Sequence, residues 1–377
     1  MVIARGHCHV YFAFLAASRV DLERAQEITR TWPTERSRFQ RNRRAPAYLD
    51  FDPLPLQITL PCESVPVGAG RFATEAQVDV TVFDFGAFSV DYRIVFQDTF
   101  EELARLSSAL YDHAGLLEHA RSRVDDLIEA LRPALAGERD RDVYEEYVVF
   151  DFAALEPGLP IRSLLEKAEL RHALAQILHA EERPLSESRV DEALRLAISY
   201  SPDDLLLVEW STAVALGGSA DERLVLEFAN TELLLLRRLD KRLDGDLEEA
   251  SRTLSRPRIR IFVGADLRKI ARLQVESAML YEGVNNAVSL LGDQWLADVY
   301  GRIAERYDLE KWEMSVAHKL ASLESIYQKI ADRAAERRSE LLEVIIIALI
   351  ALEVSWGSLF GGMRDTLARW IASRHGP

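Results

Sequence analysis

The chain has 377 residues, of which 48% are hydrophobic and 28% charged, and it carries a net charge of −15. At about 150 residues per domain, this length predicts two domains, or two domains with a helical extension. The composition excludes wholesale disorder, collagen and a polytopic membrane protein. Two cysteines, Cys8 and Cys62, exclude a disulfide scaffold. The acidic balance argues against nucleic-acid binding over the whole surface.

The first half of the chain predicts alternating strands and helices. Residues 10–18 fit either a secretory signal or part of a buried strand at 9–16. The strand is favoured because Asp21 is typical of the N-cap of a helix over 22–31. The further expected elements are a basic loop at 32–46, a strand at 56–61, a β stretch at 77–96 with a turn at Gly86, and one or two helices at 100–136.

The second half repeats this order. Its expected strands and helices lie at 147–152, 161–180, 193–200, 204–216 and 220–254. The repetition predicts an α+β protein with duplicated ferredoxin-like βαββα halves, followed by a long helical hairpin and a C-terminal apolar helix. The expected domains are a first half at 1–137, a second half at 138–257, a coiled-coil-like helical region at 258–340, an apolar helix at 341–363 and a tail at 364–377.

The apolar helix at 341–363 has three interpretations. Its uninterrupted run at 344–352 is shorter than the roughly 20 residues that span a bilayer, but the window 344–363 holds a single charge, Glu353. A membrane anchor for a cytoplasmic body is favoured over the core of a homo-oligomer and over an interfacial helix. The residues expected to serve membrane insertion or assembly are Glu343, Ala348, Ala351, Glu353, Ser355, Ser358 and Gly362.

A basic run stands out in this acidic chain. It consists of Arg36, Arg38, Phe39, Arg41, Arg43 and Arg44. Arginines at this density can follow phosphates, and an aromatic ring can stack on a base, so the run fits RNA or anionic lipid headgroups. The alternative is a loop that neutralises acidic helices of the same protein.

The sequence contains no recognisable catalytic constellation, and no cofactor or metal site is expected. Asp79, Asp84 and Asp91 are candidate acids for a metal-dependent hydrolase, but no His, Lys or Asn accompanies them at a recognisable spacing. His7 and His9 face the same side of the first strand and are a minor candidate for metal ligands.

Three segments carry a family resemblance. They are the strand at 82–86, the helix at 226–244, and the ending at 342–354 with its Leu-Glu, Ile-Ile-Ile and Glu-Val pattern. Together they resemble the "required for meiotic nuclear division" family over roughly residues 8–360. This resemblance implies an α+β body, a C-terminal membrane segment, no established enzymatic activity and, in eukaryotic members, a link to mitochondrial translation. The stretch after Gly86 departs from the family pattern.

Taken together, these observations predict a non-enzymatic, membrane-associated oligomeric scaffold that binds a partner. The alternative is a soluble RNA- or nucleotide-binding module that uses the basic run at 36–44.

Overall fold

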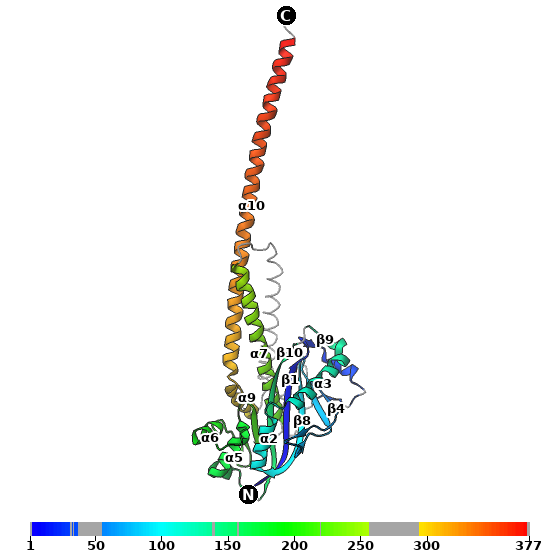
Figure 1. Cartoon of the computed structure of the whole chain (residues 1–377), viewed down its shortest axis with the longest axis vertical. Coiled ribbons are helices and arrows are strands. Elements are labelled where there is room, and N and C mark those ends of the chain that lie inside the picture. Colours follow the sequence, from blue (N-terminus) through cyan, green and yellow to red (C-terminus); the bar gives the residue numbers. More distant parts are fainter. Residues whose placement is uncertain are drawn as a thin grey trace. The chain divides into compact units, whose positions relative to one another are not determined.

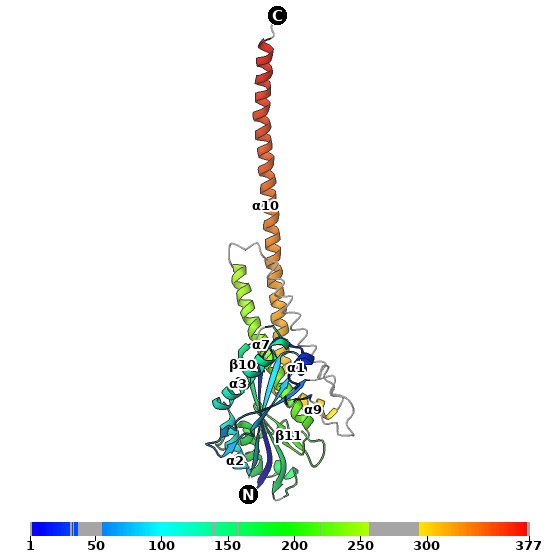
Figure 2. The same cartoon turned by 90° about the vertical axis from the view of Figure 1, so that its right-hand side faces the viewer.

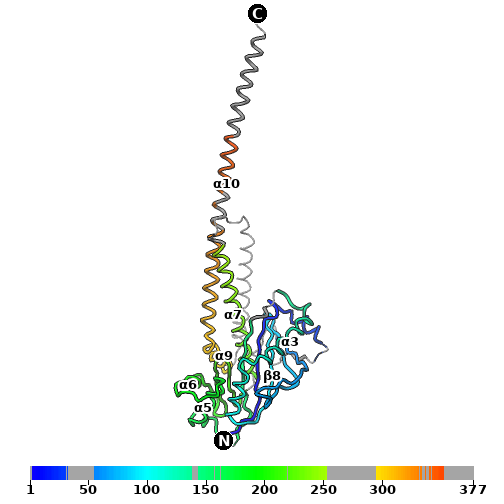
Figure 3. The backbone as a smooth tube through the Cα atoms, in the orientation of Figure 1, coloured from blue at the N-terminus to red at the C-terminus, as the bar shows by residue number. Residues whose placement is uncertain are grey.

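The computed structural model describes residues 2–30, 32, 34–36, 55–137, 140–156, 158–218, 220–255 and 294–374. Of residues 352–374 it describes only the helical backbone, and these residues are grey in Figure 3. The chain divides into two compact units. One unit comprises Met1–Arg242 with Val275–Ala317, and the other comprises Leu243–Gln274 with His318–Pro377. The first unit contains the candidate site and is described in more detail.

Within the described ranges, the first unit contains an eight-stranded sheet (Figures 1 and 2). The strand order is β11-β12-β10-β1-β8-β7-β4-β3. The bounds in that order are Leu205–Val208, Thr212–Leu216, Asp140–Glu156, Ile3–Leu15, Ala87–Thr99, Gln77–Val82, Leu56–Pro61 and Thr34–Arg36. Neighbouring strands are antiparallel, except that β10 and β12 run parallel. Short strand pairs flank this sheet, formed by β2 (Arg19–Val20) with β9 (Leu135–Ala136) and by β5 (Pro66–Val67) with β6 (Phe72–Ala73).

Strand β1 lies at the centre of the sheet. It pairs with β8 on one side and with β10 on the other along its whole length. Its residues 8–15 are all buried, on both faces of the sheet. A continuous apolar run of this kind is typical of a strand covered by helices on both sides, so the strand expected at 9–16 is confirmed and begins earlier, at Ile3.

The hairpin between β7 and β8 turns at Gly86. This glycine has a φ of +91°, and a Cβ atom in its place would lie 2.0 Å from the main-chain oxygen of Ala17. Only glycine combines this left-handed conformation with so close an approach of another backbone segment. The turn predicted at Gly86 is therefore confirmed.

Helices α1 to α6 contribute to the core on one face of the sheet. Their bounds are Leu22–Ile28, Phe100–Leu110, Ala114–Leu131, Arg162–Glu166, Ala168–His179 and Glu187–Ala193. Asp21 caps α1 by accepting a hydrogen bond from the main-chain nitrogen of Arg24 at 3.0 Å, as predicted. Side chains such as Phe12 and Tyr92 of the sheet and Leu106 of α2 are buried in this core.

Helix α7 (Ala220–Ser255) and helix α9 (Gln294–Arg306) bury apolar side chains against the opposite face. The alternation of side chains along β1 turns Tyr11 toward this layer, where it shares a cluster with Leu226 and Ile303. Two hydrogen bonds join α9 to α7. Trp295 Nε1 donates to Glu222 at 2.7 Å, and the Tyr300 hydroxyl donates to Glu232 at 2.8 Å.

Two expectations for the second half need correction. The strand predicted at 193–200 is wrong, because α6 ends at Ala193 and the following residues form a loop with one isolated bridge, Ile198 to Leu206. The mixed α+β class is confirmed, but duplicated ferredoxin-like halves are not. Strands from both halves of the chain join one sheet, with β10 beside β1.

The long C-terminal helix α10 (Leu309–Arg374) contains the apolar segment. Among the residues that the structure describes, no helix has both the length and the apolar character needed to cross a bilayer. The expected membrane anchor at 341–363, and the membrane localisation that depended on it, are therefore wrong. The physical reason is that the uninterrupted apolar run is about half the length of a spanning segment.

The second unit contains the end of α7 and most of α10. Its described buried side chains include Leu243, Leu323, Tyr327 and Ile330. The last three follow the four-and-three spacing of a helical packing seam. Lys319 Nζ lies 2.6 Å from a carboxylate oxygen of Asp244, and this ion pair joins the two helices within the unit.

Candidate functional site

Strand β10 is much longer than its neighbour β12, and this difference opens an edge in the sheet. The parallel pairing covers residues 148–152 of β10, although the strand begins at Asp140. On its other side β10 pairs with β1 at Asp140 and, after a shift in register, from Tyr144 to Phe152. Within the described residues, the stretch 140–147 therefore has a strand neighbour on one side only.

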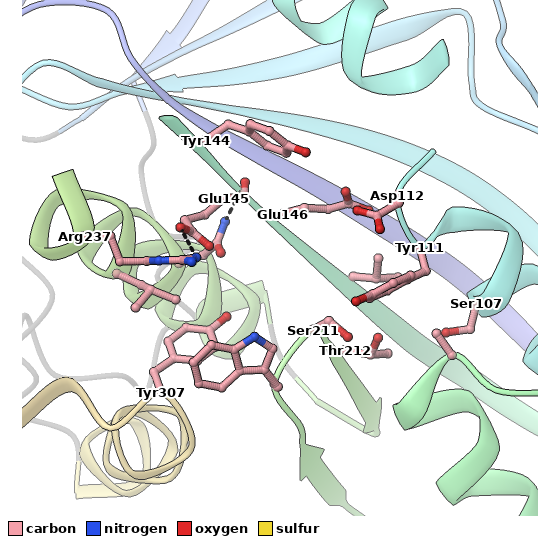
Figure 4. Close-up of a pocket in the computed structure, with 15 residues that line it drawn as sticks. Ser107, Tyr111, Asp112, Tyr144, Glu145, Glu146, Ser211, Thr212, Arg237 and Tyr307 are labelled. Atoms are coloured by element: carbon pink, nitrogen blue, oxygen red, sulfur yellow. Dashed lines mark hydrogen bonds and ion pairs between the residues drawn. The ribbon is translucent and has the colours of Figure 1, made fainter. Parts of the chain in front are cut away.

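A cavity of about 310 Å³ lies at this open edge (Figure 4). It is bordered by β10, the turn after α2, the end of α5, the β11–β12 turn, α7 and the segment after α9. The polar side chains on which its chemistry depends are Asp112, Tyr144, Glu145, Glu146, Asn230 and Arg237. The volume is at the lower end of the range for small-molecule sites.

Glu145 forms an ion pair with Arg237. One carboxylate oxygen lies 2.6 Å from Nη1 of Arg237, and the Glu145 side chain is 11% exposed. Burial raises the pKa of Glu145, whereas the charge and hydrogen bond of Arg237 act in the opposite direction. The ion pair largely cancels both charges, so neither residue gives the cavity a net charge.

Glu146 lies on the other side of the strand, beside Asp112 (Figure 4). Burial is the main cause that raises the pKa of Glu146 to about 8, and the nearby Asp112 carboxylate raises it further. Glu146 therefore holds a proton at neutral pH. A cation bound beside these two carboxyl groups would oppose that shift through its favourable charge interaction and would favour the ionised form of Glu146.

Aromatic rings form one side of the cavity. Tyr307 makes edge-to-face contacts with Tyr147 and Trp210, with ring centroids 5.8 and 5.6 Å apart. The Tyr147 hydroxyl donates a hydrogen bond to the main-chain oxygen of Glu209 at 3.1 Å, which fixes the ring next to the β11–β12 turn. Trp210 remains 47% exposed, so part of its indole is available to a ligand.

Two helices end at the cavity. Helix α2 is followed by Tyr111 and by Asp112, whose φ is +54°, and α5 is followed by its C-cap residue Ala180, whose φ is +51°. Ser107 of α2 donates a hydrogen bond to the main-chain oxygen of Ile177 in α5 at 2.7 Å, which holds these helices together. Because the C-terminal end of a helix carries a partial negative charge, both helices add to the negative potential.

The cavity also contains a buried acceptor. Asn230 is 1% exposed, and its Nδ2 donates to the main-chain oxygen of Glu145 at 3.5 Å. No described residue donates a hydrogen bond to its Oδ1. A buried acceptor without a partner costs about 1–3 kcal/mol, so this atom favours a ligand that supplies an N–H or O–H donor.

The arrangement is suited to binding a positively charged donor group. Among the residues lining the cavity in the described part of the chain, Arg237 is the only cation, and it is paired with Glu145. Asp112, Glu146 and Asn230 offer acceptors, while the aromatic rings offer π faces to a cation.

The acids suggested by the sequence lie elsewhere. Asp79 and Asp91 are opposite each other in the β7–β8 register, whereas Asp84 belongs to the hairpin turn. Asp91 lies 2.9 Å from Nδ1 of His9, and Asp79 accepts a hydrogen bond from Thr59 at 2.6 Å. In the described ranges, no group of three or more His, Cys, Asp or Glu residues has the geometry to hold a metal ion.

The residues expected to bind partners or support assembly are only partly described. Arg36 ends β3, and its backbone pairs with that of Leu56. The remainder of the basic run, Arg38, Phe39, Arg41, Arg43 and Arg44, lies outside the described residues. Glu343, Ala348 and Ala351 are exposed on α10. For Glu353, Ser355, Ser358 and Gly362 the structure describes only the helical backbone.

Sequence reasoning missed the cavity. A weak signal was present in the paired acids Glu145 and Glu146, which immediately precede the apolar run at 147–150. Two charges at the start of a buried strand are unusual, because a strand interior excludes unpaired carboxylates. The contribution of Asp112, Asn230 and Arg237 had no local sequence signal.

A family model described as "Uncharacterized protein MJ0711, N-terminal domain" matches residues 5–221. The chain belongs to this family. The uncharacterized protein MJ0711 of Methanocaldococcus jannaschii is 28% identical over 190 residues, which cover 49% of this chain and 59% of that protein. The match thus spans about three-fifths of the length of this relative. No solved structure matches the chain.

These findings overturn the resemblance to the "required for meiotic nuclear division" family. The matched family is different, and nothing in the comparisons indicates the expected one. The segments that suggested it were a buried strand, an amphipathic helix and an apolar helix. Such patterns satisfy general packing requirements, so they do not distinguish one family from another. The region matched by the MJ0711 family includes Asp112 and Glu146, whereas Asn230 and Arg237 follow it.

Proposed function

We propose that this chain is a non-enzymatic binding protein whose β10-edge cavity takes a positively charged group with N–H donors, such as an ammonium or a guanidinium. The observation that carries the proposal is the pair of carboxyl groups on Glu146 and Asp112. They lie side by side in a cavity whose arginine is already paired with Glu145. The unpartnered Oδ1 of Asn230 supports it.

Simple electrostatics favour a cation over an anion or a neutral ligand. A bound cation would interact with Asp112 and with the negative ends of α2 and α5. Its contact with an aromatic face contributes about 0.5–2 kcal/mol. An anion would meet the same charges with the opposite sign, and Arg237 would have to leave Glu145 to neutralise it.

Calorimetric titration with agmatine, which carries one guanidinium and one ammonium, tests the proposal. We expect saturable binding to the full chain. Glu146→Gln and Asp112→Asn should each weaken it at least tenfold, while Glu118→Gln, which removes an exposed charge from α3, should leave the affinity unchanged. Absence of binding to the unaltered chain, or equal binding by all variants, would overturn the proposal.

We also propose that copies of the chain assemble through α10, because a specific observation favours it. The large apolar side chains at 342–350 are 51–62% exposed, namely Leu342, Val344, Ile345, Ile346, Ile347, Leu349 and Ile350. Positions this close together cover every side of a helix, and a helix that is apolar all round is normally buried. Burial among copies of α10 would remove this surface from water.

The alternative of an RNA-, nucleotide- or lipid-binding module depends on the basic run at 36–44 and stays a prediction. It predicts salt-sensitive binding that is lost when these arginines are replaced by alanine.

A further inference from the structure

The open edge of β10 offers main-chain groups as well as side chains. The main-chain nitrogen of Val148 donates to the oxygen of Ser211 at 2.9 Å, at the point where pairing with β12 begins. In a strand, the hydrogen-bonding direction of the backbone alternates from one residue to the next. The N–H and C=O groups of Glu146 and Tyr144 therefore point to the same side as those of Val148, away from β1.

These main-chain groups have no strand partner in the described part of the chain. On this side β10 pairs only with β12, and that pairing stops at Thr212. The cavity begins at this place, since Tyr144, Glu145, Glu146 and Val148 all line it. The cavity is thus a slot along a strand edge, with the β11–β12 turn at one end (Figure 4).

The two sides of the slot differ in charge. Alternation along β10 places Glu146 on the side of Asp112 and α2, and it places Glu145 on the side of Arg237 and α7. A strand inserted into the slot would present successive side chains to these two sides in turn. One side chain of the inserted strand would meet Glu146 and Asp112. The next side chain would meet Arg237, which disfavours a positive charge at that second position.

We propose that the ligand of this cavity is an extended peptide segment of a partner protein, which pairs with residues 144–146 of β10 and places one Lys or Arg side chain beside Glu146 and Asp112. This inference rests on the proposed cation-binding function and names its ligand. The peptide would lie beside β10 in line with β12, next to Thr212, the first residue of β12. Addition of a strand to a sheet edge derives affinity from main-chain hydrogen bonds and selectivity from alternate side chains.

The geometry limits the recognised segment to a few residues. At about 3.3 Å per residue, three residues of β10 edge correspond to about 10 Å of extended chain. The N–H and C=O groups of Tyr144 and Glu146 offer four hydrogen bonds to such a segment. A free amine can satisfy the carboxyl groups but leaves most of these main-chain groups to water.

The test uses an acetylated and amidated pentapeptide of sequence TVKVT, titrated into the full chain beside agmatine. We expect the peptide to bind at least tenfold more tightly than agmatine. Two N-methylated versions, each methylated at one alternate set of amides, should behave differently. The set that faces β10 should lose at least tenfold in affinity, and the set that faces away should keep it. A TVEVT peptide should bind at least tenfold more weakly than TVKVT.

The possible failures are distinguishable. If agmatine binds but the peptide binds no more tightly, or if both N-methylated peptides lose affinity equally, the peptide inference is overturned and the cation site stands. If neither agmatine nor TVKVT binds, both proposals fail. If the main-chain amide NMR shifts caused by TVKVT concentrate at Tyr144 and Glu146, they would support binding at the edge of β10. Shifts confined to other strands would contradict binding there.

Discussion

Glu146 illustrates how one half-buried carboxyl group links the cavity to pH. Its side chain is half-buried at the edge of β10 and lies beside another acid, so its pKa rises from 4.5 to about 8. The folded state therefore holds this proton more tightly than the unfolded chain does. The resulting contribution to stability is fully present below pH 4.5 and is lost as the pH rises through about 8.

We predict that Glu146→Gln flattens this dependence. Between pH 5 and pH 8 the unaltered chain should lose stability relative to the variant, by at most about 1.4 kcal/mol per pH unit. Urea unfolding midpoints at pH 5, 6.5 and 8 measure the difference. Glu118→Gln, which replaces an exposed glutamate of α3, is the control for the loss of one carboxyl group. If the difference in stability between Glu146→Gln and the unaltered chain does not change with pH, the raised pKa of Glu146 is contradicted.

The affinity for a cation should depend on whether Glu146 is protonated. Because a bound cation favours ionised Glu146, binding releases a proton below pH 8. We therefore expect the affinity for agmatine to rise up to about tenfold between pH 7 and pH 8. In Glu146→Gln the affinity should be weaker and nearly independent of pH. Titrations in two buffers with different ionisation enthalpies would detect the released proton, and equal heats in both would argue against proton release.

At the scale of individual residues, the sequence predicted little of the cavity. Glu145 and Glu146 are adjacent in the chain, but nothing local separates their roles. Glu145 is neutralised by Arg237, which is 92 positions away, while Glu146 meets Asp112 from the turn after α2. Contacts between such distant positions depend on strand order and helix packing, and a periodicity of 2 or 3.6 residues does not contain that information.

Individual elements were predicted far better. The strand at Leu56–Pro61 has the predicted bounds, and the long β stretch forms a hairpin at Gly86. Both predictions used local rules, namely alternation and the conformational freedom of glycine. The strand predicted at 193–200 failed because this short stretch has no strand neighbour beyond one bridge to Leu206. Strand formation requires a partner, and the local pattern cannot supply one.

The hairpin allows a prediction with a matched control. Gly86 and Gly70 have similar left-handed φ values of +91° and +84°, but a Cβ at Gly86 would meet Ala17, whereas a Cβ at Gly70 would meet nothing within 4 Å. Gly70→Ala should cost about 1–2 kcal/mol of backbone strain. Gly86→Ala should cost more, because the β7–β8 turn must also move. Chemical denaturation measures the free energy of unfolding of both variants. Equal losses of stability would contradict the predicted clash between a Cβ at position 86 and Ala17.

For the whole molecule, assembly through α10 should depend on the apolar residues at 342–350. We predict that Ile346→Lys combined with Ile350→Lys reduces the mass measured by light scattering to that of one chain, because charges would have to enter a buried helix interface. Met314→Lys is the control, since Met314 is an exposed apolar residue of the same helix outside this run. A single-chain mass for the unaltered protein would contradict assembly.

The central place of β1 has a consequence for how the protein is made. Both neighbours of β1, namely β8 and β10, follow it in the chain, so its second neighbour is complete only after residue 156 has been synthesised. The parallel pair of β10 and β12 must wait for residue 216. Contacts over such long sequence separations fold slowly. During that interval β1 presents a long apolar edge to the cell, so the growing chain should depend on chaperones more than a helical bundle of equal size.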